Sequence, residues 1–170
     1  MSTYYTFYLG RRGKKTHEVE IIGNYVKIGD EYFDVPIHEV SASFIDGESF
    51  VERGEPIRLE RFKDYFEVSW LTEGAITELM ATRPFLVQGY LPYDDITHIT
   101  KHGYDYWDDI EFIPAETFAE KTNRKGYGHA AALDKHSAGY HAMFLMNALD
   151  SIYASRIGEN WESGIVMTVG

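Results

Sequence analysis

The sequence predicts an α+β fold in which a mainly antiparallel sheet is packed by a C-terminal helix. Three observations predict it. Apolar and polar residues alternate at the two-residue period of strands through much of the first half of the chain. A long run with helical periodicity lies near the C-terminus, and a short apolar strand follows it. Strands and helices also lack the regular alternation that a parallel βαβ fold requires.

The first half of the chain is interpreted as three or four antiparallel strands. Residues 3–9 are rich in Thr and aromatic side chains, and residues 16–22 alternate apolar and acidic positions, so these segments are expected to form a hairpin. The strand pattern continues through residues 24–28 and 31–44. The cations between the first two segments are interpreted as a solvated basic tip. They are Arg11, Arg12, Lys14 and Lys15.

The middle of the chain mixes turns, helices and strands. Residues 46–56 are charged and rich in turn-forming residues, so they are expected to form a loop that leaves the sheet. Residues 57–70 are interpreted as a short helix that runs into a strand. Thr72 is expected to cap a helix over residues 72–82, and residues 85–91 are expected to form another strand.

The last third holds the clearest helix. A short helix is expected over residues 114–121, because proline suits a first helical turn. Residues 137–157 place Leu and Ile on one face, with Ser137 as the N-cap and Gly158 at the C-terminal end. Residues 164–169 are expected to form a terminal strand.

Length and composition restrict the class of protein. A chain of 170 residues fits one α+β domain, residues 1–170, with 46–56 as the candidate internal boundary. The lack of cysteine excludes disulfides, thiolate nucleophiles and Cys-ligated zinc, which is typical of a cytoplasmic protein. Neither a signal sequence nor an apolar run of membrane-spanning length is recognised, so secretion and membrane insertion are not expected.

The negative charge is concentrated in one segment. Of the formal net charge of −11, residues 90–120 hold eight carboxylates against one lysine, together with seven aromatic side chains. An acidic chain repels nucleic acid, so direct DNA or RNA binding is not expected, whereas basic protein surfaces are attracted. Carboxylates can imitate phosphates while aromatic side chains supply buried contacts. The alternative is that the carboxylates only keep an aromatic surface soluble. The candidate partner-binding residues are Asp94, Asp95, Tyr104, Asp105, Tyr106, Trp107, Asp108, Asp109 and Glu111.

A glycine-rich basic loop at residues 123–128 is an alternative site. Backbone N–H groups and positive charge there would suit the phosphate of a nucleotide. The residues involved would be Arg124, Lys125, Gly126, Gly128 and His129. The loop does not match the nucleotide-binding phosphate-loop motif, and a solvated surface loop is the other interpretation.

A metal centre is the third alternative. His98 and His102 are four residues apart and would share one face of a helix, as metal ligands do. Ile99 stands where a metalloprotease of the HExxH type carries its glutamate, and Gly103 makes a regular helix doubtful. We therefore assign no metal and no cofactor. No catalytic motif is present either, since adjacent residues such as His136 and Ser137 rarely form a base and nucleophile pair.

Four segments carry a resemblance to a known group of proteins. They are the opening TYYTFYLGRR, then GYLPYDDI, EFIPAETFAEK and the closing GIVMTVG. These resemble small orphan proteins of bacteriophages and integrated elements of gut Firmicutes. Small acidic phage proteins of this kind resemble inhibitors of host defence systems, anti-CRISPR proteins among them. The resemblance implies no catalytic residue and carries no residue roles.

The leading hypothesis is a non-enzymatic binding protein of the host bacterial cytosol. It would inhibit a bacterial defence protein of the CRISPR type by occupying a basic, nucleic-acid-binding surface. The alternatives are a binder that sequesters a nucleotide signal and a metal-dependent hydrolase. The sequence leaves the partner and the oligomeric state, a homodimer included, open.

Overall fold

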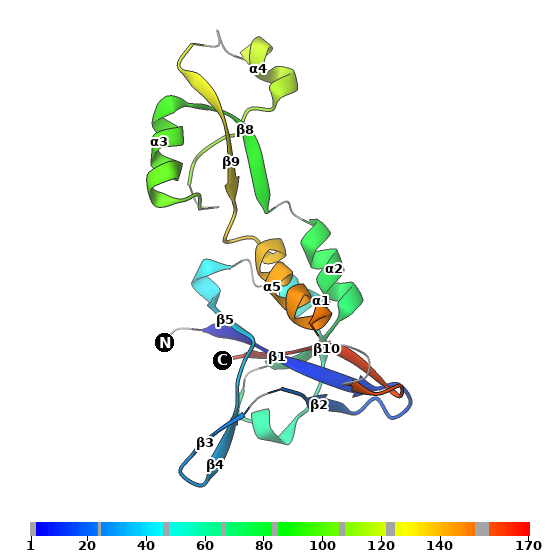
Figure 1. Ribbon diagram of the computed structural model, residues 1–170. Helices are drawn as coiled ribbons and strands as arrows, with labels where there is room; N and C mark the ends of the chain where they lie inside the picture. Colours follow the sequence, from blue (N-terminus) through cyan, green and yellow to red (C-terminus); the bar gives the residue numbers. More distant parts are fainter. Residues whose placement is uncertain are drawn as a thin grey trace.

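The structure, a computed structural model, describes residues 3–23, 25–45, 48–65, 67–82, 85–105, 108–121, 125–151 and 157–170. The chain forms an α+β fold with two lobes (Figure 1). The larger lobe is built on a mainly antiparallel sheet, and the smaller lobe, residues 86–133, is inserted between two helices of the larger one. Within the described part of the chain, no helix combines the length and apolar character needed to cross a membrane.

The sheet of the larger lobe has six strands in the order β2-β1-β10-β7-β6, and β5 also pairs with β1. The two central strands are long and antiparallel, and they pair from Tyr5–Val169 to Gly13–Trp161. This pairing brings the two ends of the chain together. The strands are β1 (Tyr4–Gly13), β2 (Val19–Ile21), β5 (His38–Ser41), β6 (Glu55–Pro56), β7 (Glu67–Thr72) and β10 (Trp161–Val169).

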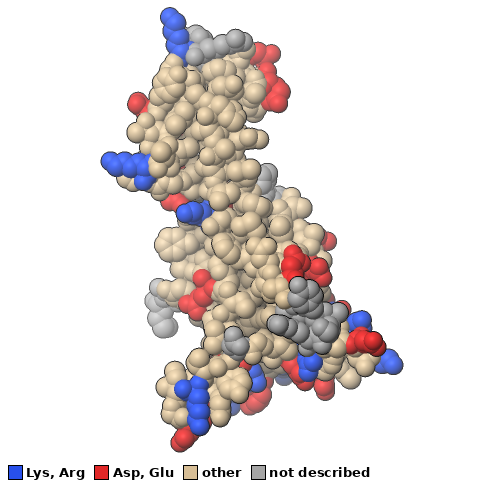
Figure 2. Space-filling view, viewed as in Figure 1, with Lys and Arg blue, Asp and Glu red and all other residues tan. Residues whose placement is uncertain are grey.

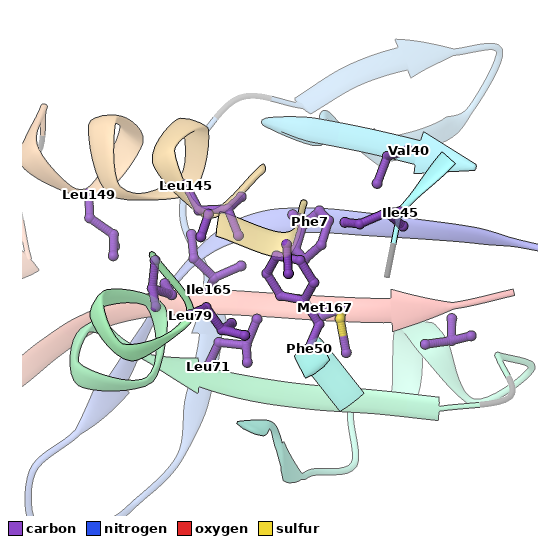
Figure 3. Close-up of a cluster of buried hydrophobic side chains, with 14 residues drawn as sticks. Phe7, Val40, Ile45, Phe50, Leu71, Leu79, Leu145, Leu149, Ile165 and Met167 are labelled. Atoms are coloured by element: carbon purple, nitrogen blue, oxygen red, sulfur yellow. The ribbon is translucent and has the colours of Figure 1, made fainter. Parts of the chain in front are cut away.

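Three helices cover one face of this sheet: α1 (Glu48–Arg53), α2 (Glu73–Thr82) and α5 (Ala138–Asp150). Figure 3 shows the core between the two layers, where Phe7 of β1, Phe50 of α1 and Leu145 of α5 are fully buried together. Burying each such side chain contributes about 2–3 kcal/mol. The C-terminal helix therefore packs on the sheet, as its apolar face predicts.

The other face of the sheet is covered by a turn, η2 (Glu60–Phe62), around Trp70. Gly10 of β1 and Gly164 of β10 are paired directly opposite each other, and the Trp70 ring lies over both. A Cβ on Gly10 would lie 2.9 Å from that ring. The two glycines therefore make the space that the indole fills.

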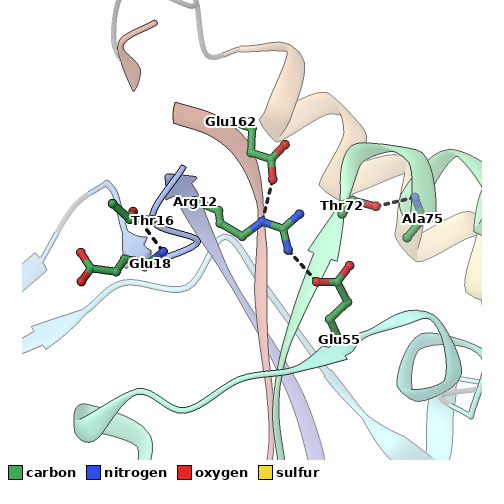
Figure 4. Close-up of polar contacts among 7 residues, drawn as sticks. All are labelled: Arg12, Thr16, Glu18, Glu55, Thr72, Ala75 and Glu162. Atoms are coloured by element: carbon green, nitrogen blue, oxygen red, sulfur yellow. Dashed lines mark hydrogen bonds and ion pairs between the residues drawn. The ribbon is translucent and has the colours of Figure 1, made fainter. Parts of the chain in front are cut away.

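Arg12 of the central strand β1 binds side chains of the central strand β10 and of the edge strand β6. Its guanidinium donates to Glu162 of β10 at 2.6 Å and to Glu55 of β6 at 2.5 Å (Figure 4). It also lies 5.5 Å from the Trp70 ring. Arg11 likewise pairs with Glu20. The two arginines lie within β1, so the predicted basic tip is wrong for them, and the turn that follows begins at Lys14.

A second hairpin, β3 (Tyr25–Ile28) and β4 (Glu31–Asp34), projects from the larger lobe instead of joining its sheet (Figure 1). The short 3-10 turn η1 (Ala42–Phe44) follows β5. The expectation of a loop over residues 46–56 is wrong, because α1 and β6 lie there and Phe50 is part of the core.

The smaller lobe is a two-stranded ribbon with a helix on each side. It contains β8 (Leu86–Pro92), α3 (Tyr93–His102), α4 (Ala115–Lys121) and β9 (Tyr127–Leu133). Residues 127–128 were expected in a loop, but they begin β9. Gly89 has a φ of +155°, and a Cβ there would lie 2.7 Å from the carbonyl oxygen of Ile113, which pairs with Tyr90. Only glycine fits this approach.

Several expected helix boundaries are confirmed. Thr72 Oγ1 accepts from the Ala75 N–H at 3.1 Å, and Ser137 Oγ accepts from the Gly139 N–H at 3.2 Å. The helix α5 ends at Asp150, with Ser151 as its C-cap, while Ile157 is again helical and Gly158 follows it with a φ of +87°. Residues 152–156, which the sequence also assigned to that helix, lie outside the described residues.

Candidate functional site

The first two candidate carboxylates lie at the start of α3. This helix begins at Tyr93 directly after β8, and the Tyr93 N–H donates to the carbonyl oxygen of Gly126 at 2.9 Å. Asp94 is exposed and Asp95 is half-buried, both in the first helical turn. The positive end of the helix dipole stabilises carboxylates there. Asp94 and Asp95 therefore stabilise α3 whether or not they also contact a partner.

The next two candidate residues, Asp105 and Asp108, form a turn that the Asp108 carboxylate closes. The helix α3 is regular as far as His102, and Gly103, with a φ of +78°, ends it. The expectation that Gly103 disrupts a helix through His98 and His102 is therefore wrong. The Asp105 N–H donates to the Asp108 carboxylate at 3.0 Å, and the Asp108 N–H donates back to the Asp105 carbonyl at 2.9 Å. His98 Nε2 lies 3.8 Å from the same Asp108 carboxylate. Asp108 is therefore a structural residue of this turn.

Asp105 also connects the two lobes. Its carboxylate lies 3.0 Å from Nε2 of His136, a buried residue just before α5. The buried Asp134 carboxylate accepts from the His136 N–H at 3.1 Å, and the Asp134 N–H donates to the Phe85 carbonyl at 2.6 Å. This neck of hydrogen bonds fixes the smaller lobe where the chain enters and leaves it.

Asp109 and Glu111 follow the turn and are both exposed. The chain then returns beside β8, where Ile113 and Tyr90 exchange two backbone hydrogen bonds of 2.8 and 3.0 Å. The segment therefore runs back along α3, a helix about 15 Å long. We call these four candidate acids the α3 carboxylates: Asp94 and Asp95 in the first turn of α3, and Asp109 and Glu111 on the segment after the turn at Asp108.

The aromatic side chains of the segment mostly pack within the lobe. Tyr90 stacks on Phe118 at 4.1 Å, and Tyr104, half-buried, meets Phe112 edge-on at 5.4 Å. Tyr106 and Trp107, which the sequence singled out, lie outside the described residues. Tyr93 is 59% exposed beside Asp94, and sequence reasoning missed it as a candidate. Its place in the first helical turn was the available signal.

The acidic side chains do not form one continuous field on the face shown in Figure 2. They make separate patches along the margins of the smaller lobe, with basic side chains between them. The α3 carboxylates therefore lie at two places in the smaller lobe, the first turn of α3 and the segment after Asp108, and not on the one acidic surface that the sequence predicts.

The two histidines of α3 share one face, as their spacing predicts. The rings of His98 and His102 lie 5.1 Å apart on the exposed side of the helix. Among the described residues, no group of three or more His, Cys, Asp or Glu side chains is arranged to hold a metal ion.

The glycine-rich loop leads into a strand. Lys125 and Gly126 form a turn, and β9 begins at Tyr127, so no helix N-terminus follows the loop. The Gly126 carbonyl accepts from Tyr93, Gly128 packs against Ile96 and Tyr93, and His129 meets the Tyr90 ring edge-on. Arg124 lies outside the described residues.

A histidine pair lies in the larger lobe, with His141 buried and His38 half-buried. His38 Nε2 lies 2.9 Å from Nδ1 of His141, although the two residues are 103 positions apart. His141 Nε2 lies 2.7 Å from the Lys135 carbonyl. Burial, together with nearby His38 and His136, lowers the pKa of His141 to about 4, and burial also lowers the pKa of His38. Sequence reasoning missed this pair, because nothing local connects the two positions.

Comparison of the chain with protein-family models, curated protein sequences and solved structures finds no match.

Proposed function

We propose that this chain is a non-enzymatic binding protein whose α3 carboxylates contact a basic, nucleic-acid-binding surface of a bacterial defence protein of the CRISPR type, and that the contact inhibits that protein. The observation that carries the proposal is that Asp94 and Asp95 share the first turn of α3 with the exposed ring of Tyr93, while Asp109 and Glu111 are exposed on the segment that follows this helix.

Electrostatics supports a protein partner over a nucleic acid. The chain carries a formal net charge of −11. Proteins that bind nucleic acid do so through lysine and arginine, which neutralise the phosphates and release the counterions bound to them. A basic groove on a protein attracts carboxylates as it attracts phosphates, so its electrostatic interaction with an acidic chain is favourable. An exposed tyrosine beside the carboxylates supplies the apolar contact on which protein interfaces rely.

The contact is expected to be narrower than residues 94–111 as a whole. Asp105 and Asp108 already serve the chain's own fold through His136, His98 and the turn between them. Replacing them would loosen the lobe as well as change its charge. The proposal therefore rests on the α3 carboxylates and Tyr93, with Tyr104 as a half-buried neighbour.

The first experiment captures the partner with the purified chain from lysate of the bacterial host and identifies it by mass. The captured protein is then tested with the double variant Asp94→Lys/Asp109→Lys. Because two attractive charges become repulsive, affinity is expected to fall by at least about 100-fold, and wild-type affinity is expected to fall steeply with salt.

The matched control is Asp64→Lys/Glu159→Lys, which makes the same charge change at two exposed positions of the larger lobe. It should keep most of the affinity. If both double variants lose the same affinity for the partner, the effect depends on the net charge of the chain and not on the α3 carboxylates. Binding that ignores salt, or an Asp94→Lys/Asp109→Lys variant that still inhibits fully, would contradict the proposal.

A further inference from the structure

The projecting ribbon of β3 and β4 concentrates the exposed apolar surface of the described chain. Of the fourteen large hydrophobic side chains that are exposed, seven lie between Tyr25 and Ile37. The ribbon stands away from the main sheet, at the end of the molecule opposite the smaller lobe (Figure 1). Monomeric proteins rarely expose so much apolar surface on one element unless that surface is an interaction site.

The two sides of the ribbon differ. On one side the Tyr25 and Tyr32 rings meet edge-on at 5.2 Å, and Lys27 lies 5.5 Å from the Tyr32 ring. Asp34, on the same side, is bound by Arg61 of η2 at 2.5 Å. This side is polar and faces the larger lobe, with which it encloses a pocket of about 450 Å³.

The opposite side is mainly apolar, and Glu31, paired with Ile28, is its one charged side chain within β3 and β4. Val26 and Phe33 are paired across the ribbon, and Ile28 lies on the same side two residues beyond Val26. Val35 and Ile37 continue the alternation in sequence as the chain leaves β4 and returns to the main sheet, where the Ile37 N–H donates to the Phe7 carbonyl oxygen at 2.8 Å, and all five side chains are exposed. We call these five residues the apolar ribbon face. Together they present apolar surface on the order of 400 Å², within the range of functional patches on monomers.

We propose that the apolar ribbon face is the contact of a symmetric homodimer, in which the ribbon of one copy packs face to face on the ribbon of a second copy. An interface core that is about 60% apolar would then bury roughly 700 Å² per protomer, close to the ~800 Å² of a standard interface. A two-stranded ribbon is marginally stable in water, and a second ribbon supplies the missing layer.

Charge favours a second copy over a basic partner at this face. From Tyr25 to Ile37 the only charged side chains are Lys27, Asp30, Glu31 and Asp34, and Asp34 is already neutralised by Arg61. The acidic segment, residues 90–120, lies in the other lobe. Two copies that meet through their ribbons therefore hold their most acidic parts far apart, which limits the repulsion between chains of net charge −11.

The test measures the mass of the full chain in solution by light scattering and sedimentation over a range of concentrations. A dimer with a Kd of about 1–100 µM is expected from an interface of this size. Ile28→Asp, at a side chain 67% exposed, is expected to raise the Kd at least tenfold. The matched control is Leu86→Asp, in a strand of the other lobe and 54% exposed, which should leave the Kd unchanged.

A second arm uses the lack of cysteine. Ile28→Cys introduces the only thiol of the chain, and mild oxidation is expected to give a covalent dimer, whereas Leu86→Cys should give little. Circular dichroism establishes that each variant is folded. A wild-type chain that stays monomeric at about 100 µM overturns the proposal. A dimer that Ile28→Asp leaves intact overturns it as well, and so does equal cross-linking of the Ile28→Cys and Leu86→Cys variants.

Discussion

Acid should destabilise this protein through His141. The Lys135 carbonyl can only accept, so His141 Nε2 carries a hydrogen and Nδ1 accepts from His38 in the neutral pair. Protonating His141 would place a second donor against His38 in a buried site. The folded chain resists this charge, and the pKa of His141 is lowered from 6.5 to about 4.

The sign and size follow from proton linkage. Between pH 6.5 and about 4 the unfolded chain binds a proton at residue 141 that the folded chain does not, so the free energy of unfolding falls as the pH falls. The contribution is fully present above pH 6.5. At about 1.4 kcal/mol for each pH unit, its loss by pH 4 amounts to about 3 kcal/mol.

The assay is urea unfolding, followed by tryptophan fluorescence, at pH 7.5, 5.5 and 4.5 in wild type and His141→Gln. Glutamine keeps a donor for the Lys135 carbonyl but does not titrate, so the variant should lose about 2–3 kcal/mol less between the extreme pH values. His17→Gln, at an exposed turn, is the control and should follow wild type. If wild type and His141→Gln lose stability in parallel, the assignment to His141 is refuted.

Three further predictions concern packing and capping, each measured as a change in the free energy of unfolding by urea at pH 7.5. Leu145→Ala should cost about 2–5 kcal/mol, because it opens a cavity in the fully buried core, and the exposed Leu133→Ala should cost far less. Gly164→Ala should cost about 1–3 kcal/mol, since its Cβ would meet the Trp70 ring; no loss would show that the ring can move aside. Ser137→Ala should cost about 1 kcal/mol by removing the N-cap of α5.

Elements with a strong local signal were predicted from the sequence. The caps at Thr72 and Ser137 and the terminal strand were recognised because side-chain capping and a continuous apolar run depend on neighbours in the chain. The helix α1 was missed because six residues are too few to show a period, and burial of Phe50 in the core stabilises it instead. The start of β9 was missed because glycine and alanine are poor strand formers that pairing with β8 overrides.

The candidate site was predicted in part. Its acidic composition can be taken from the sequence, but which of its carboxylates make contacts within the chain cannot. Asp105 and Asp108 were expected to face a partner, whereas His136 and His98 engage them within the chain. These contacts depend on where the neck places α5 against the smaller lobe, which no local pattern encodes.

The sequence alone determined the α+β class, the negative net charge and the absence of disulfides and thiol groups, because these depend on composition and on patterns that repeat every few residues. Only the tertiary structure decided that His38 meets His141, that a pair of glycines admits Trp70, and that one ribbon leaves its apolar face uncovered. The physical reason is that each of these depends on contacts between segments far apart in the chain, and burial, not local propensity, sets their energies.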